Sequence, residues 1–125
     1  MVKRLILALG TVAAAAVSPV LAHHAWPVDN TRSVTVTGTV TSYEFANPHV
    51  MIGLDVKAAD GTVEKWNVGG PSTSRMERNG WKRDTLKTGD VITAIGNRFT
   101  DGQRALRLDK VVMAGGQEMF LYGRR

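Results

Sequence analysis

The order of its short alternating segments constrains the fold of this 125-residue chain more than any other feature. Five runs alternate apolar and polar residues with the two-residue period of a half-buried strand. One segment with a different pattern interrupts them after the third run. It has a proline near its start, serines that could cap a helix, and Asn79-Gly80 at its end, so we predict a short helix there. The five runs lie at 33–45, 49–57, 62–68, 91–96 and 105–113, the helical segment at 69–81, and a short closing strand is possible at 117–123.

Three strands, a helix and then two or more strands is the element order of an OB-fold barrel. Small barrels need bent strands, and Gly38 and Gly96 interrupt two of the runs where a bulge or bend would. Gly61 and Gly102 follow aspartates in predicted hairpin turns. We therefore predict an all-β protein, a small OB-like barrel of five to six strands with one short helix between strands three and four. A β-sandwich is the alternative, and the position of the helix favours the barrel.

The first 22 residues have the three parts of a secretory signal peptide, namely a basic head, an apolar run and small residues at the end. Val20 and Ala22 would occupy positions −3 and −1 of the cleavage site. We expect cleavage after Ala22, an N-terminal arm at 23–32, a barrel domain at 33–125 and a periplasmic or secreted location. An uncleaved membrane anchor is the alternative, but the run is rich in alanine and weakly hydrophobic for a spanning helix. We expect no membrane anchor after cleavage.

Composition narrows the possible functions. Sixteen basic and 11 acidic residues give +5, and removal of Lys3 and Arg4 leaves 14 basic residues, or +3. The basic residues are scattered, so we expect no nucleic-acid partner. The absence of cysteine excludes disulfides and thiolate metal sites. No catalytic constellation is visible, and we therefore expect a binding module and not an enzyme.

The three histidines form the candidate metal site. After cleavage, His23 would be the first residue, and its α-amine and imidazole could chelate one metal ion. His49 would supply a third nitrogen, an arrangement called a histidine brace in copper proteins, and His24 offers an alternative square-planar set. Such nitrogen ligands favour Cu(II), Ni(II) or Zn(II), with Cu(II) bound most tightly, so copper is the predicted cofactor. In the opposing interpretation, His23 and His24 are a solvated tail and His49 satisfies local backbone groups.

The tryptophans form a second candidate site. Aromatic side chains on the second and third strands of OB barrels stack on ligands. Trp66 lies in the third run, and Trp26, Trp81 and Arg78 are the other residues that such a surface could use. The alternative function is thus a metal-free adaptor or ligand-binding barrel that contacts a glycan or a protein partner. The opposing interpretation places Trp66 and Trp81 in the core. Core packing is also the preferred interpretation of the methionines Met51, Met76, Met113 and Met119.

Several motifs resemble an uncharacterised family of small secreted bacterial proteins with OB-like domains. Those proteins start, after a signal peptide, with His-His and an aromatic residue, and they contain an Asn-Pro-His turn. The resemblance implies the fold but no established activity, and the broader likeness is to periplasmic OB-fold proteins that bind small ligands or cations. The matching stretches are HHAW (23–26), GTV (38–40), NPH (47–49), Trp66, RNGW (78–81) and LKTGD (86–90).

Overall fold

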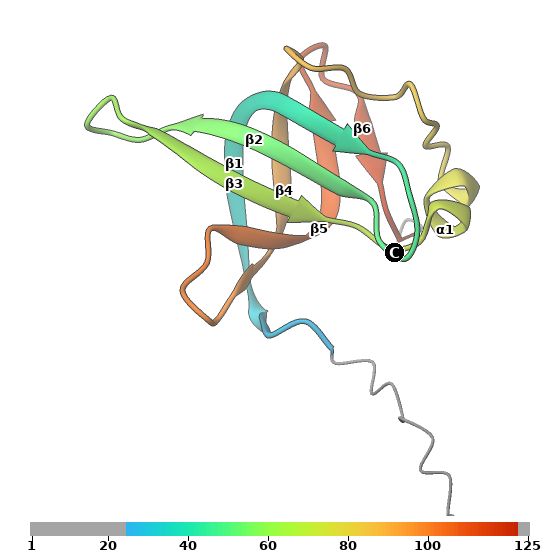
Figure 1. The fold of residues 1–125 in the computed structure, drawn as a ribbon, viewed down its shortest axis with the longest axis horizontal. Coiled ribbons are helices and arrows are strands. Elements are labelled where there is room, and N and C mark those ends of the chain that lie inside the picture. The colour runs from blue at the N-terminus through green and yellow to red at the C-terminus, as the bar shows by residue number, and fades with distance from the viewer. Residues whose placement is uncertain (1–24, 123–125) are drawn as a thin grey trace, which may run out of the picture.

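The structure is a computed structural model that describes residues 25–122. The predicted signal peptide, its cleavage site, His23 and His24 lie outside the described residues. Figure 1 shows strands that wrap around one another, with a short helix at one end. The elements are β1 (Val28–Glu44), β2 (Met51–Lys57), β3 (Val63–Gly69), α1 (Thr73–Arg78), β4 (Val91–Phe99), β5 (Ala105–Met113) and β6 (Glu118–Phe120).

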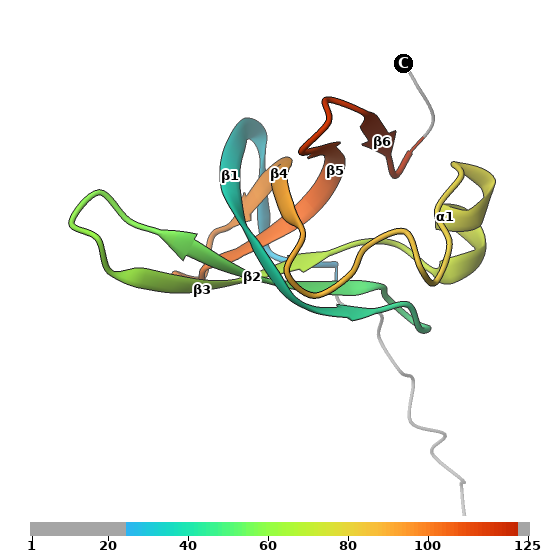
Figure 2. The ribbon, with the colours of Figure 1, turned by 90° about the horizontal axis from the view of Figure 1, so that it is seen from above.

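The strands form one sheet in the order β3-β2-β1-β4-β5-β6, and an additional pairing of β3 with β5 closes five of them into a ring. The β3–β5 pairing is parallel, whereas the other pairings are antiparallel. The helix α1 lies between β3 and β4 in sequence. This arrangement confirms the predicted small all-β, OB-like barrel. Seen from above, the β2–β3 hairpin projects at one end of the molecule and α1 lies at the other (Figure 2).

Two glycines stand where strands approach one another too closely for a side chain. A Cβ added at Gly38 would lie 2.5 Å from the carbonyl oxygen of Asp55, and one at Gly96 would collide with the carbonyl of Arg107. The register of β4 against β5 shifts at Gly96, and β1 shifts against β2 just after Gly38, between Val40 and Ser42. The predicted bends therefore coincide with positions that only glycine fits.

The first strand begins at Val28 and not at Ser33, so part of the predicted N-terminal arm belongs to the sheet. Val28 pairs with Phe99, and the register against β4 then shifts before Ser33 pairs with Asn97. The buried Asn97 amide bridges this irregular stretch, because its Nδ2 donates to the carbonyls of Asp29 and Arg32, each at 2.9 Å. The polar residues there hide the strand from a search for alternating hydrophobicity.

The core fills the barrel and continues beneath the helix. Trp81, Met76 and Leu121 are fully buried, and they connect α1 and the segment after it to the residues that follow β6. The indole Nε1 of Trp81 donates to the carbonyl of Phe120 at 2.9 Å, which satisfies its polar atom inside the core. Within residues 25–122, no helix is long and apolar enough to cross a membrane.

Candidate functional site

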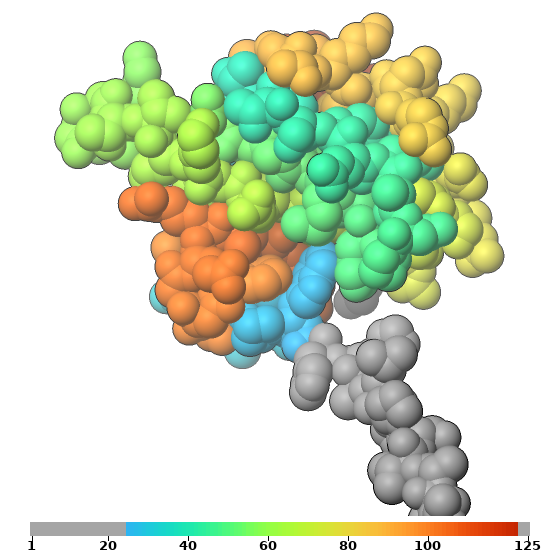
Figure 3. All heavy atoms as spheres, in the orientation of Figure 1, coloured from blue at the N-terminus to red at the C-terminus, as the bar shows by residue number. Residues whose placement is uncertain are grey.

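Backbone hydrogen bonds fix the start of the described chain against the end of β4. The carbonyl of Pro27 accepts from the backbone N–H of Thr100 at 2.8 Å and from its hydroxyl at 3.2 Å. The N–H of Val28 donates to the carbonyl of Trp26 at 2.9 Å, which turns the chain tightly. Figure 3 shows these first residues, in blue, packed between the orange β4–β5 segment and the green segment that leads into β2. The position of Trp26 therefore follows from strand pairing.

The indole of Trp26 lies between two aromatic rings and the backbone of β3. Its centroid is 4.6 Å from that of His49 and 5.7 Å from that of Phe99. A Cβ added at Gly69 would collide with the far edge of the indole, so the ring covers the place of a missing side chain on β3. Gly69 pairs with Met51 across the sheet, and the indole is thereby brought beside Met51.

His49 is exposed, but its ring is oriented by the backbone. Its Nδ1 lies 3.2 Å from the carbonyl oxygen of Gly70. Because a carbonyl only accepts, Nδ1 must carry the proton, and the neutral ring then has its lone pair on Nε2. The preceding turn is tied to α1, since Oδ1 of Asn47 accepts from the N–H and the hydroxyl of Thr73 at 3.0 and 3.1 Å. A backbone carbonyl on one ring nitrogen is the common arrangement around metal-binding histidines.

A cavity of about 370 Å³ opens beside these residues. Its lining contains no lysine, arginine, aspartate or glutamate, so the polar groups are an imidazole, two amides and backbone. Within residues 25–122, no three His, Cys, Asp or Glu side chains gather closely enough to hold a metal ion. A histidine-based site therefore needs ligands from outside that range or a donor of another kind. The lining residues are Trp26, Pro48, His49, Met51, Asn67, Gly69, Phe99, Gln103, Ala105 and Leu106.

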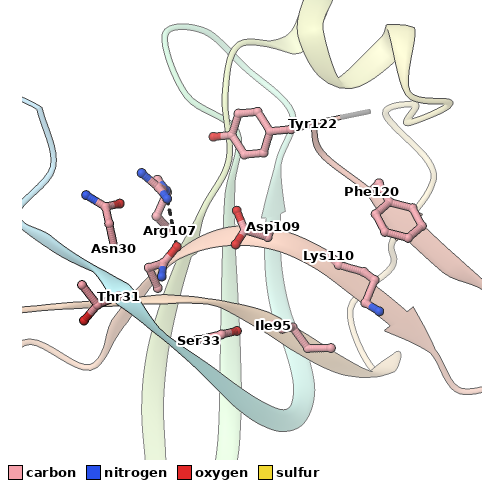
Figure 4. Close-up of a pocket in the computed structure, with 10 residues that line it drawn as sticks. Asn30, Thr31, Ser33, Ile95, Arg107, Asp109, Lys110, Phe120 and Tyr122 are labelled. Atoms are coloured by element: carbon pink, nitrogen blue, oxygen red, sulfur yellow. Dashed lines mark hydrogen bonds between the residues drawn. The ribbon is translucent and has the colours of Figure 1, made fainter. Parts of the chain in front are cut away.

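A larger cavity, of about 710 Å³, lies between the beginning of β1 and the last described residues, Phe120 and Tyr122. Figure 4 shows Arg107 and Asn30 on one side of it and Lys110 and Phe120 on the other. The guanidinium Nη2 of Arg107 donates to Oδ1 of Asn97 at 2.9 Å, so Arg107 supports the amide that orders the start of β1. Burial raises the pKa of the Tyr122 hydroxyl in this cavity above its ordinary value. We assign this cluster a structural role.

Trp66 and Trp81 do not form the predicted ligand-binding surface, because both are buried. Trp81 has no exposed surface, and Trp66 is 8% exposed, with the guanidinium of Arg98 over its ring at 5.3 Å from the centroid. Both rings belong to the core: Trp66 alternates with exposed residues in β3, and Trp81 packs there from the segment after α1. Trp26 is half-buried and lines the 370 Å³ cavity, whereas Arg78 is exposed at the end of α1 and does not line it. The structure therefore brings together Trp26 and His49 but not Trp66, Trp81 and Arg78.

Comparisons with known proteins identify the family and the fold. The profile of a family of unknown function (DUF6152) matches residues 9–107, so the chain belongs to that family. Its description and the small all-β fold give no sign of enzymatic activity. No curated protein matches the chain. The crystal structure of TiaS in complex with a transfer RNA and ATP is similar over 69% of this chain, with 19% identity and a TM-score of 0.50. This chain spans 19% of that protein, and the likeness concerns the fold alone.

Proposed function

We propose that this protein is a periplasmic or secreted binding module for a divalent transition metal, with copper preferred. The leader is removed after Ala22, and His23 becomes the first residue. Its α-amine and imidazole bind the metal together with the imidazole of His49, and His24 adds a further nitrogen. Nitrogen ligands without a thiolate suit Cu(II), which binds such sites more tightly than the other divalent first-row metals.

The contact between Trp26 and His49 is the observation that carries this proposal. Trp26 follows His23 by three residues, a length of chain that spans about 10 Å when extended. The 4.6 Å separation of the Trp26 and His49 rings thus leaves the processed terminus within reach of His49. Ala25, the first described residue, lines a small cavity together with His49, which agrees with this path of the chain.

The orientation of His49 supports the same proposal. With Nδ1 donating to Gly70, the free lone pair is on Nε2, and that nitrogen is the one available to a metal. The hydrogen bond also restricts rotation of the ring, which lowers the entropy lost when a ligand is bound.

A Cu(II) titration of the correctly processed protein tests the proposal, with intact mass to confirm that the chain starts at His23. We expect one nitrogen-rich Cu(II) per chain, seen by electron paramagnetic resonance, and a loss of affinity of at least about tenfold in His49→Ala. One additional Met before His23 should weaken binding similarly, because it removes the α-amine from the chelate. The matched control carries the additional Met after Arg125. Equal affinity of the two extended proteins would contradict the proposal.

If Cu(II) binds no more tightly than to a short His-His peptide, the metal-free alternative takes precedence. In that case the protein would contact a glycan or a protein partner. The surface to test would be the 370 Å³ cavity, where Trp26 and Phe99 provide the accessible aromatic rings.

A further inference from the structure

Met51 differs from the other methionines of the barrel. Met76 is fully buried in the core, and Met113 and Met119 pack against it. Among the described residues, Met51 belongs neither to the core cluster nor to the half-buried side chains packed on it. It lines the 370 Å³ cavity instead. Core packing, which the sequence favoured for these four methionines, therefore does not explain Met51.

The backbone places Met51 and His49 on one side of the chain. Val50, between them, is fully buried, its N–H donates to the carbonyl of Pro71, and its own carbonyl accepts from Gly70. Side chains alternate in an extended segment, so the neighbours of Val50 both point away from the core. Both line the same cavity, and the indole of Trp26 lies against His49 and over the β3 position that pairs with Met51.

An imidazole, a thioether and an aromatic face are the groups that a soft, monovalent metal ion prefers. Thioether sulfur selects Cu(I) over divalent ions, and imidazole binds both oxidation states. The π face of an indole attracts a cation held within about 6 Å of the ring. We infer that Nε2 of His49 and the sulfur of Met51 form a Cu(I) site under the indole of Trp26. This inference rests on the proposed function, because it takes copper as the metal and shares His49.

The absence of charged side chains from the cavity lining favours a monovalent ion over a divalent one. No carboxylate lines it, so nothing within the cavity would neutralise a second positive charge on a bound ion. Burying an uncompensated charge is costly, and the cost rises with the size of the charge. Cu(I) therefore fits this cavity better than Cu(II). In the proposed function, the same Nε2 binds Cu(II) together with the chain terminus, so the two ions compete for one nitrogen. The two oxidation states then share one histidine and differ in their other ligands.

An anaerobic Cu(I) titration of the processed protein, in competition with bicinchoninate, tests the inference. The test variant is Met51→Leu, which keeps the volume and removes the sulfur, and the matched control is Met113→Leu. We expect Met51→Leu to lose at least about tenfold in Cu(I) affinity, as is usual for the loss of a metal contact, and to keep its Cu(II) affinity. X-ray absorption of the Cu(I) protein should show one sulfur scatterer, which is absent in Met51→Leu.

The outcomes separate this inference from the proposed function. A Met before His23 should weaken Cu(II) and leave Cu(I) unchanged, because the Cu(I) ligands are internal. His49→Ala should weaken both. If Cu(II) binding fails while Cu(I) binding depends on Met51, the terminal chelate is wrong and the internal site stands. If Met51→Leu binds Cu(I) as tightly as Met113→Leu and as the parent protein, or no sulfur scatterer is seen, the inference is wrong.

Discussion

Trp81 and Trp26 are the same side chain in two different environments. Trp81 has no exposed surface, its Nε1 is hydrogen-bonded to Phe120, and its neighbours are core residues. Trp26 lies outside the core, against the only histidine of the described chain and beside a methionine that the core does not use. One set of large side chains, those of the core, therefore stabilises the barrel. A second set, gathered by the N-terminal arm, is available for binding.

Truncation of the two tryptophans should give the largest difference in stability between the core and the binding region. Trp81→Ala should reduce the free energy of unfolding by about 3–5 kcal/mol, since it opens a large cavity in the core. Trp26→Ala should cost much less stability, because its ring lies outside the core. It should weaken Cu(I) binding, because the ring lines the 370 Å³ cavity. Urea denaturation of both variants measures the difference. Equal losses of stability would show that the arm is part of the core, which would remove the basis for a separate binding region.

Two Gly→Ala substitutions compare the barrel with the binding region by adding one methyl group to each. Gly96→Ala should destabilise the protein by about 1–3 kcal/mol or more, because the new methyl group meets the rigid backbone of Arg107. Gly69→Ala meets the far end of the Trp26 indole, which can shift, so stability should change little. Displacement of the indole should nevertheless weaken Cu(I) binding. Thermal unfolding and the Cu(I) competition together test this pair, and unchanged Cu(I) affinity in Gly69→Ala would contradict the role given to Trp26.

The barrel was predictable because its signals are local. Alternation identified the five main strands, Gly61 and Gly102 marked hairpin turns, and both have the positive φ, 85°, that such turns require. The position of one short helix between the third and fourth strands then left few topologies. Metal ligation by His23 and His24 stays a prediction, because both lie outside the described residues.

The binding region was less predictable because it depends on long-range pairing. The buried Asn97 is polar, and nothing near it in sequence indicates that it holds the carbonyls of Asp29 and Arg32. That bridge, with Thr100, sets where Trp26 lies. Met51 did leave a signal: the alternation that buries Val50 and Ile52 points it outward. Core packing was nevertheless the preferred interpretation of Met51, and no local signal in the sequence brings Trp26 to it.

The smallest expected effect is a pH dependence of the stability, which arises from a tyrosine of the barrel. Tyr43 packs against the core, its hydroxyl donates to the carbonyl of Lys82 at 2.7 Å, and burial raises its pKa to about 12. The unfolded chain loses this proton near pH 10, whereas the folded protein keeps it, so stability should fall as the pH rises from 10 toward 12. Tyr43→Phe should lessen that fall, and Trp26→Phe, which changes only the binding region, should leave it unaltered. Urea denaturation across this range checks the slope; an identical slope in Tyr43→Phe would mean that the hydroxyl is not protected by the fold.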